Sequence, residues 1–162
     1  MELLDRKGFL AYLKNRSRPA DAGGFTFAKQ KGGVVFKAKD IMSKTVTAIS
    51  PEQTLLDAIQ LLVCKQISGM PVLDAGGRLV GIVTEKDILN FVFSGNLKNT
   101  KVKDVMTTEV VTFSPEDDVD AIALVIGQNR FRRVPIVEGG AVVGIVSRRD
   151  IIQAALDIHC KV

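Results

Sequence analysis

The chain has 162 residues, 46% of them apolar, and a formal net charge of +4, which suits one domain of ordinary size plus an appendage. No apolar run approaches the roughly 18 residues of a membrane span, and the first residues lack the long apolar stretch of a secretory signal. The two cysteines, Cys64 and Cys160, have no metal-ligand spacing and favour a cytoplasmic protein, with Cys64 expected in the core.

The N-terminal arm, residues 1–36, carries the excess positive charge. It has seven Lys/Arg against three Asp/Glu, whereas residues 37–162 have fifteen of each. Apolar residues from Leu3 to Leu13 predict one short amphipathic helix. A basic arm can contact nucleic acid or acidic membranes, but a solvated terminus is the simpler interpretation.

Residues 37–162 contain an internal repeat with a spacing of 64 residues, which becomes 63 after Glu138. Lys37–Met42 returns as Lys101–Met106, and Met70–Val72 returns as Val134–Ile136. One copy of about 55 residues is marginal as a core, but two copies can bury their apolar faces against each other. We therefore expect two units, 37–95 and 96–162, related by a pseudo-twofold axis, with a binding site at their seam.

The sequence of each copy predicts the order strand, helix, strand, hairpin, strand, helix. The expected fold class is α+β or α/β, with a small three-stranded sheet and two helices in each copy. Residues 45–49 form the first predicted strand. A helix is expected to begin after Ser50, with Pro51 at its first position and Gln53 closing a capping box. Its buried face is predicted from the apolar spacing as Leu55, Ile59, Leu62 and Val63.

Turn residues divide the remaining elements. Residues 74–77 and 138–140 predict hairpin turns in the two copies, and residues 94–96 predict the linker between the copies. The closing helices are expected to begin at Thr84 and Ser147.

One motif occurs in both copies: Gly, two apolar residues, Ser or Thr, two variable residues and Asp, over Gly81–Asp87 and Gly144–Asp150. A Ser or Thr three residues before an acid forms a capping box, which needs no ligand. The same strand end also offers unpaired backbone N–H groups, a hydroxyl and a carboxylate, which suit the vicinal diol of a ribose. The residues alone leave both interpretations open.

In their order, the duplicated elements resemble a tandem pair of CBS domains, also called a Bateman module. The resemblance covers residues 37–162 and rests on the paired Asp-Ile/Val-Met, Ser-Pro-Glu, Met/Val-Pro-Val/Ile and Gly-x-x-Thr/Ser-x-x-Asp segments. It implies clefts between the units that bind AMP, ADP, ATP or S-adenosylmethionine as regulatory ligands, with no required cofactor. It also implies a homodimer and an unidentified regulated protein.

The resemblance also assigns residues to the ligand. Ribose would be held by Thr84, Asp87, Ser147 and Asp150. Adenine would be read by backbone groups of Val46, Thr47, Ala48, Val110, Val111 and Thr112. On the family scheme Asp87 faces Val111, and Asp150 faces Thr47.

The copies differ where phosphate would bind. The second copy has Arg130, Arg132, Arg133, Arg148 and Arg149, whereas the first has Gln66–Gly69 and Glu85–Lys86 there. Arginines in the first turn of a helix oppose its dipole, so they indicate a function, and a guanidinium matches phosphate oxygens. Family precedent assigns phosphate contacts to Arg132, Arg133 and Arg149. We predict that the Asp87 cleft prefers a phosphorylated nucleotide, while the Asp150 cleft is weaker, empty or suited to a less charged adenosyl ligand.

Catalytic patterns are poor, so we predict a protein that is not an enzyme and has no metal site. His159 is the sole histidine and has no second base beside it, and no phosphate-loop or dinucleotide motif occurs. The leading hypothesis is a regulatory module that senses adenosine-containing nucleotides. The alternatives are a nucleic-acid-binding protein that uses the basic arm, and a ligand-free dimerisation scaffold in which Asp87 and Asp150 are only helix caps.

Overall fold

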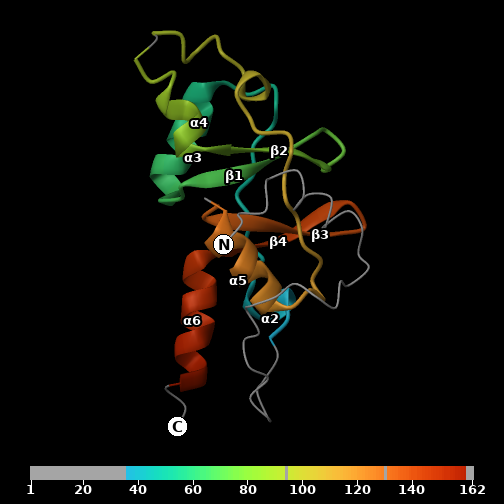
Figure 1. The fold of residues 1–162 in the computed structure, drawn as a ribbon. Coiled ribbons are helices and arrows are strands. Elements are labelled where there is room, and N and C mark those ends of the chain that lie inside the picture. The colour runs from blue at the N-terminus through green and yellow to red at the C-terminus, as the bar shows by residue number, and fades with distance from the viewer. Residues whose placement is uncertain (1–35, 94, 130, 160–162) are drawn as a thin grey trace. The chain divides into compact units, whose positions relative to one another are not determined.

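The computed structural model describes residues 36–93, 95–129 and 131–159. They all belong to one compact unit, residues 35–162. The N-terminal helix predicted from Leu3 to Leu13 lies outside the described residues. Figure 1 shows the elements, which in chain order are α2 (Ala38–Ile41), α3 (Leu55–Lys65), β1 (Gly69–Leu73), β2 (Leu79–Thr84), α4 (Glu85–Leu89), η1 (Val102–Asp104), α5 (Val119–Gln128), β3 (Arg133–Glu138), β4 (Ala141–Ser147) and α6 (Arg148–His159).

Each copy contains the predicted antiparallel hairpin. β1 pairs with β2, and β3 pairs with β4. In the first turn, Asp74 Oδ1 accepts hydrogen bonds from the backbone N–H groups of Gly76 and Arg78, both at 2.9 Å. The second turn is shorter and passes through Gly139 and Gly140, whose φ angles of 58° and 86° favour glycine.

The predicted third strand of each sheet is reduced to a single bridge. Residues 45–48 are not in a ladder, and Ile49 alone makes a parallel bridge to Val72 of β1. Its N–H donates to the Pro71 carbonyl at 3.1 Å. Phe113 makes the equivalent bridge to Ile136 of β3. The extended segment before each of these residues therefore keeps most of its backbone groups free of the sheet.

Helix α3 begins four residues later than predicted. Thr54 is its N-cap, and Thr54 and Asp57 form the capping box, in which Asp57 Oδ2 accepts from the Thr54 N–H at 2.8 Å. Ser50 and Gln53 form a turn before it. The reason is tertiary: the Gln53 carbonyl accepts from the N–H of Val102 at 2.9 Å, so this stretch pairs with a distant segment instead of starting the helix.

The apolar face of α3 is also rotated relative to the prediction. Leu55, Ala58 and Leu62 are buried, whereas Val63 is 70% exposed. Cys64 is exposed, so its predicted place in the core is wrong. The helical spacing i, i+3, i+7 that starts at Leu55 is the one that faces the sheet.

The two copies exchange their leading segments, residues 37–47 and 101–111. Ser43 of the first copy pairs with Ile145 of β4, with both N–H···O distances at 3.0 Å. Thr107 of the second copy pairs with Ile82 of β2 in the same way, with both distances at 2.9 Å. Figure 1 accordingly shows α2 among elements of the second copy. Each sheet is therefore completed by residues from the other copy.

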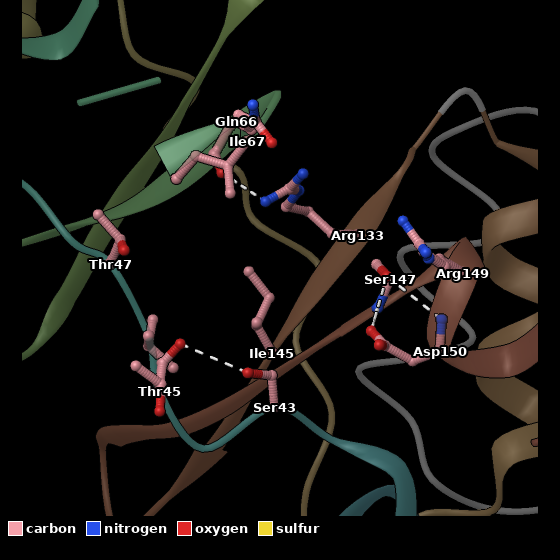
Figure 2. Close-up of a pocket in the computed structure, with 12 residues that line it drawn as sticks. Ser43, Thr45, Thr47, Gln66, Ile67, Arg133, Ile145, Ser147, Arg149 and Asp150 are labelled. Atoms are coloured by element: carbon pink, nitrogen blue, oxygen red, sulfur yellow. Dashed lines mark hydrogen bonds between the residues drawn. The ribbon is translucent and has the colours of Figure 1, made fainter. Parts of the chain in front are cut away.

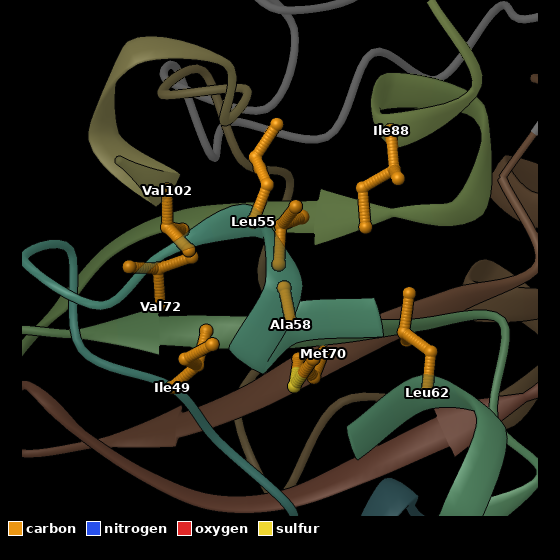
Figure 3. Close-up of a cluster of buried hydrophobic side chains, with 9 residues drawn as sticks. Ile49, Leu55, Ala58, Leu62, Met70, Val72, Ile88 and Val102 are labelled. Carbon is orange, nitrogen blue, oxygen red and sulfur yellow. The ribbon is translucent and has the colours of Figure 1, made fainter. Parts of the chain in front are cut away.

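The hydrophobic core follows the same exchange. The buried cluster of the first copy consists of Ile49, Leu55, Ala58, Leu62, Met70, Val72, Val83, Ile88 and Val102. Val102 belongs to the leading segment of the second copy, and Figure 3 shows it among the first-copy side chains. Ala38, from the leading segment of the first copy, is fully buried as well. Burial of this exchanged apolar surface stabilises the pair as one unit.

Candidate functional site

Both repeated motifs form helix caps. Asp87 Oδ2 accepts from the N–H of Thr84 at 2.9 Å and from its hydroxyl at 2.6 Å. Asp150 Oδ2 accepts from the N–H of Ser147 at 2.7 Å and from its hydroxyl at 2.6 Å. The closing helices α4 and α6 begin directly after Thr84 and Ser147, as predicted. Both motifs therefore cap helices, as the capping interpretation predicted.

The caps do not use the whole carboxylates. Within the described ranges, the hydrogen bonds that the carboxylates of Asp87 and Asp150 accept all go to Oδ2, and Oδ1 accepts none. A carboxylate has about four lone-pair sites, so Oδ1 can accept from a ligand hydroxyl while Oδ2 holds the cap. A cap and a ribose contact are compatible on the same side chain.

A cavity of about 270 Å³ lies beside Asp150. It is built by the leading segment of the first copy, the end of α3 with the start of β1, and the β3, β4 and α6 elements of the second copy. Its lining residues are Ser43, Thr45, Val46, Thr47, Gln66, Ile67, Gly69, Arg133, Ile145, Ser147, Arg149 and Asp150. The cavity therefore lies at the seam between the copies, where the repeat predicted a site.

Two walls of the cavity are polar. Figure 2 shows Thr45 and Thr47 on one side, and Asp150 with Arg149 on the other. Asp150 and Thr47 line the same cavity, and their joint contact with one ligand stays a prediction.

Arg133 joins the two copies across this cavity. Its Nη1 donates to the Gly69 carbonyl at 2.8 Å, and its Nη2 donates to Ser68 Oγ at 3.0 Å. Burial lowers the pKa of the Arg133 guanidinium, while the nearby carboxylates of Asp150 and Glu85 raise it. An arginine side chain stays protonated in proteins, so the cavity contains a fixed positive charge.

The arginines expected at phosphate are divided between the two sides of the seam. Arg133 and Arg149 line the Asp150 cavity. The phosphate contacts of these arginines and the preference of the Asp87 cleft for a phosphorylated nucleotide stay predictions. Arg132 points elsewhere, with its Nη1 3.8 Å from Glu85 Oε2 near the start of α4. Neighbouring residues of an extended chain project to opposite faces, which explains the separation of Arg132 from Arg133.

The residues expected at adenine differ between the copies. Val46 and Thr47 line the cavity beside Asp150, whereas Ala48 does not. Residues 110–112 form a half-buried, non-ladder segment before Phe113. The pairing of Asp87 with Val111 stays a prediction.

Several lining residues were not predicted. Gln66 and Ile67 end α3, where Gln66 adopts a left-handed conformation with φ of 52°. Ser43 and Ile145 line the cavity through the bridge that exchanges the leading segments. The one available signal for Gln66–Gly69 was the repeat itself. At the offset of 64, this stretch of the first copy aligns with residues 130–133 of the second copy, which include the arginines.

Comparison with known proteins identifies the family. The CBS domain family model matches residues 38–94 and 102–157, so the chain belongs to the CBS-domain family and carries a tandem pair of these domains. The uncharacterized protein MJ1426 of Methanocaldococcus jannaschii is 32% identical, and the match covers 76% of this chain and 94% of that protein.

Two similar solved structures contain adenosine compounds. CBSX2 of Arabidopsis thaliana in complex with AMP is 29% identical with a TM-score of 0.70, covering 76% of this chain and 98% of that one. The CBS domain pair of MJ0100, in complex with 5-methylthioadenosine and S-adenosyl-L-methionine, is 29% identical with a TM-score of 0.69. That match covers 77% of this chain and 99% of the other.

An enzyme is also among the relatives. The inosine-5'-monophosphate dehydrogenase of Methanocaldococcus jannaschii is 36% identical over 120 residues, but the match spans only 23% of that enzyme. Among the helices of the described ranges, none is long and apolar enough to cross a bilayer. In the same residues no group of three or more His, Cys, Asp or Glu side chains could hold a metal ion.

Proposed function

We propose that this protein is a regulatory module that binds an adenosine-containing nucleotide in the Asp150 cavity. The observation that carries the proposal is the composition of that cavity. It is lined by Ser147 and Asp150, by Val46 and Thr47, and by Arg133 and Arg149. Asp150 and Ser147 suit the ribose diol, residues 46–47 suit the adenine edge, and the two arginines suit a phosphate.

Both copies line the cavity, which gives a ligand a way to act on the protein. Thr47 and Gln66 come from the first copy, and Ser147 and Asp150 come from the second. A ligand that contacts both copies shifts their relative arrangement only as far as it prefers one arrangement over another. We infer that this shift is the output passed to a partner protein, and that the module itself performs no catalysis.

The test is a comparison of two matched variants, Asp150→Asn and Asp87→Asn. Asparagine keeps the size of the side chain and an oxygen that can accept the cap hydrogen bonds, so folding is preserved. Adenosine, AMP, ADP, ATP and S-adenosylmethionine are titrated into each variant and the wild type by calorimetry. We expect Asp150→Asn to weaken binding in this cavity by about tenfold or more, because a charged acceptor is lost. Asp87→Asn should leave that binding within about twofold of wild type.

Melting temperatures give a second readout. A ligand at about 100 times its Kd stabilises the native state by about 2.7 kcal/mol, which raises the melting temperature by several degrees. If none of the five compounds binds wild type, the proposal is wrong and the scaffold alternative gains support. Salt-dependent binding to nucleic acid that disappears on deletion of residues 1–36 would favour the basic-arm alternative.

We also propose a homodimer, because each copy exposes large apolar side chains on or beside its helices. They are Val63, Leu89 and Phe93 in the first copy, and Leu124, Ile152 and Leu156 in the second. Phe93 is 96% exposed, and contact with a second chain would remove its ring from water. Light scattering should give twice the chain mass for wild type and a lower mass for Phe93→Ser with Ile152→Ser. A monomeric wild type would contradict this.

A further inference from the structure

The contact between Arg133 and Gly69 joins two equivalent positions of the repeat. Their numbers differ by 133 − 69 = 64, the offset between the copies in this part of the chain. The Arg133 guanidinium reaches across to the carbonyl of its own counterpart, at 2.8 Å. A contact between equivalent positions lies on or beside the pseudo-twofold axis that relates the copies.

A second pair of equivalent positions supports this placement. Arg78 and Ala141 differ by 63, the offset after the one-residue deletion, and they form an antiparallel bridge with each other. A Cβ at Gly69 would lie 2.9 Å from Thr84 Cγ2 and 3.1 Å from the Val83 carbonyl oxygen, so that position takes no side chain without rearrangement.

The hydrogen-bond partners of the half-buried Arg133 side chain carry no charge. Both Nη atoms bond to neutral acceptors of the first copy, and within the described residues the buried Nε has no hydrogen-bond partner. An anion adds the attraction between opposite charges, and a phosphate can accept two parallel hydrogen bonds from one guanidinium. An anion placed in the cavity would therefore be a better partner for this guanidinium than Ser68 or Gly69.

We propose that Arg133 is an anion-operated clasp: it ties the two copies together through Ser68 and Gly69, and an anionic group of the bound ligand draws it away. This inference rests on the proposed function and adds how the site distinguishes an anionic ligand from an uncharged one. A phosphorylated nucleoside opens the clasp and changes the arrangement of the copies, whereas an uncharged nucleoside binds and leaves the clasp closed.

The strength of the clasp and the affinity for the anion depend on each other through thermodynamic linkage. If the anion binds more tightly when the clasp is open, then weakening the clasp must strengthen anion binding by the same factor. Ser68 accepts one of the two clasp bonds but does not line the cavity. Ser68→Ala therefore removes part of the clasp without changing the cavity wall.

The experiment titrates adenosine and AMP into wild type, Ser68→Ala and Arg133→Gln. Lys98→Gln is the control, since it removes one positive charge from an exposed residue outside the cavity. We expect wild type to bind AMP about tenfold or more tightly than adenosine. Ser68→Ala should tighten AMP binding by about two- to tenfold and leave adenosine unchanged. Arg133→Gln should remove most of the preference for AMP, and Lys98→Gln should keep it.

Hydrogen–deuterium exchange gives an independent readout that does not need the Arg133 variant to fold. In wild type, AMP should increase exchange at residues 66–70, and adenosine should not. The clasp is refuted if Ser68→Ala changes AMP and adenosine binding equally or changes neither. It is also refuted if adenosine binds wild type as tightly as AMP, in which case the proposed function stands. If neither compound binds, both proposals fall.

Discussion

The side chain of Met42, in the first copy, packs directly against the backbone of Gly144 in β4 of the second. Met106 packs in the same way on Gly81 of β2, where an added Cβ would lie 2.7 Å from its sulfur. These two glycines open the repeated motif that ends at Asp87 and Asp150. They are needed because the exchanged leading segments approach the sheets too closely for any side chain.

We therefore predict that Gly144→Ala destabilises the protein by about 1–3 kcal/mol, as overpacking does elsewhere. Adding Met42→Ala should recover part of this loss, because the smaller side chain makes room. Chemical denaturation of the single and double variants measures both effects.

Gly127→Ala is the control for this experiment. Gly127 lies in α5 with nothing within 4 Å of an added Cβ, so alanine there should be neutral or stabilising by up to about 1 kcal/mol. A Gly144→Ala variant as stable as wild type would show that the contact with Met42 yields easily.

The observed start of α3 leads to a second prediction. Thr54→Ala should cost about 1 kcal/mol of stability, because it removes the N-cap side chain of the helix. Ser50→Ala should cost less, since Ser50 belongs to a turn before the helix. Equilibrium unfolding of both variants checks the order, and a larger loss for Ser50→Ala would place the cap where the sequence predicted it.

The cap of α3 should also make stability depend on pH. Hydrogen bonds from the backbone and side chain of Thr54 lower the pKa of Asp57 below its usual 3.8. A lowered folded-state pKa means that this stabilisation is present above pH 3.8 and is lost as the pH falls through the folded-state value. Asp57→Asn should therefore melt below wild type at pH 7, and the difference should shrink towards pH 3. A constant difference would contradict this assignment.

The exchange of leading segments predicts which fragments fold. The fragment 37–95 follows the sequence repeat but lacks Val102 and the Thr107 strand partner of β2. The fragment 44–107 includes both. We expect 44–107 to unfold more cooperatively in thermal circular dichroism than 37–95, although both are short enough to be marginal. Equal behaviour of the two fragments would mean that the exchanged segment contributes little.

Local patterns were sufficient for much of the fold. The hairpins follow from turn residues such as those at 74–77, and the caps at Thr84 and Ser147 follow from an acid three residues further on. These features depend on neighbours in the chain, so a sequence records them directly. The start of α3 was misplaced because two capping boxes follow each other, and pairing of Gln53 with Val102 decides between them.

The sequence by itself determined that two similar units exist, that each contains a hairpin and a capped closing helix, and that Asp87 and Asp150 lie at equivalent strand ends. Only the tertiary structure decided that the leading segments change places and that Arg133 and Arg149 share a cavity with Asp150. The physical reason is the pseudo-twofold axis: it brings together residues about 64 positions apart, and no local sequence pattern records contacts over that separation.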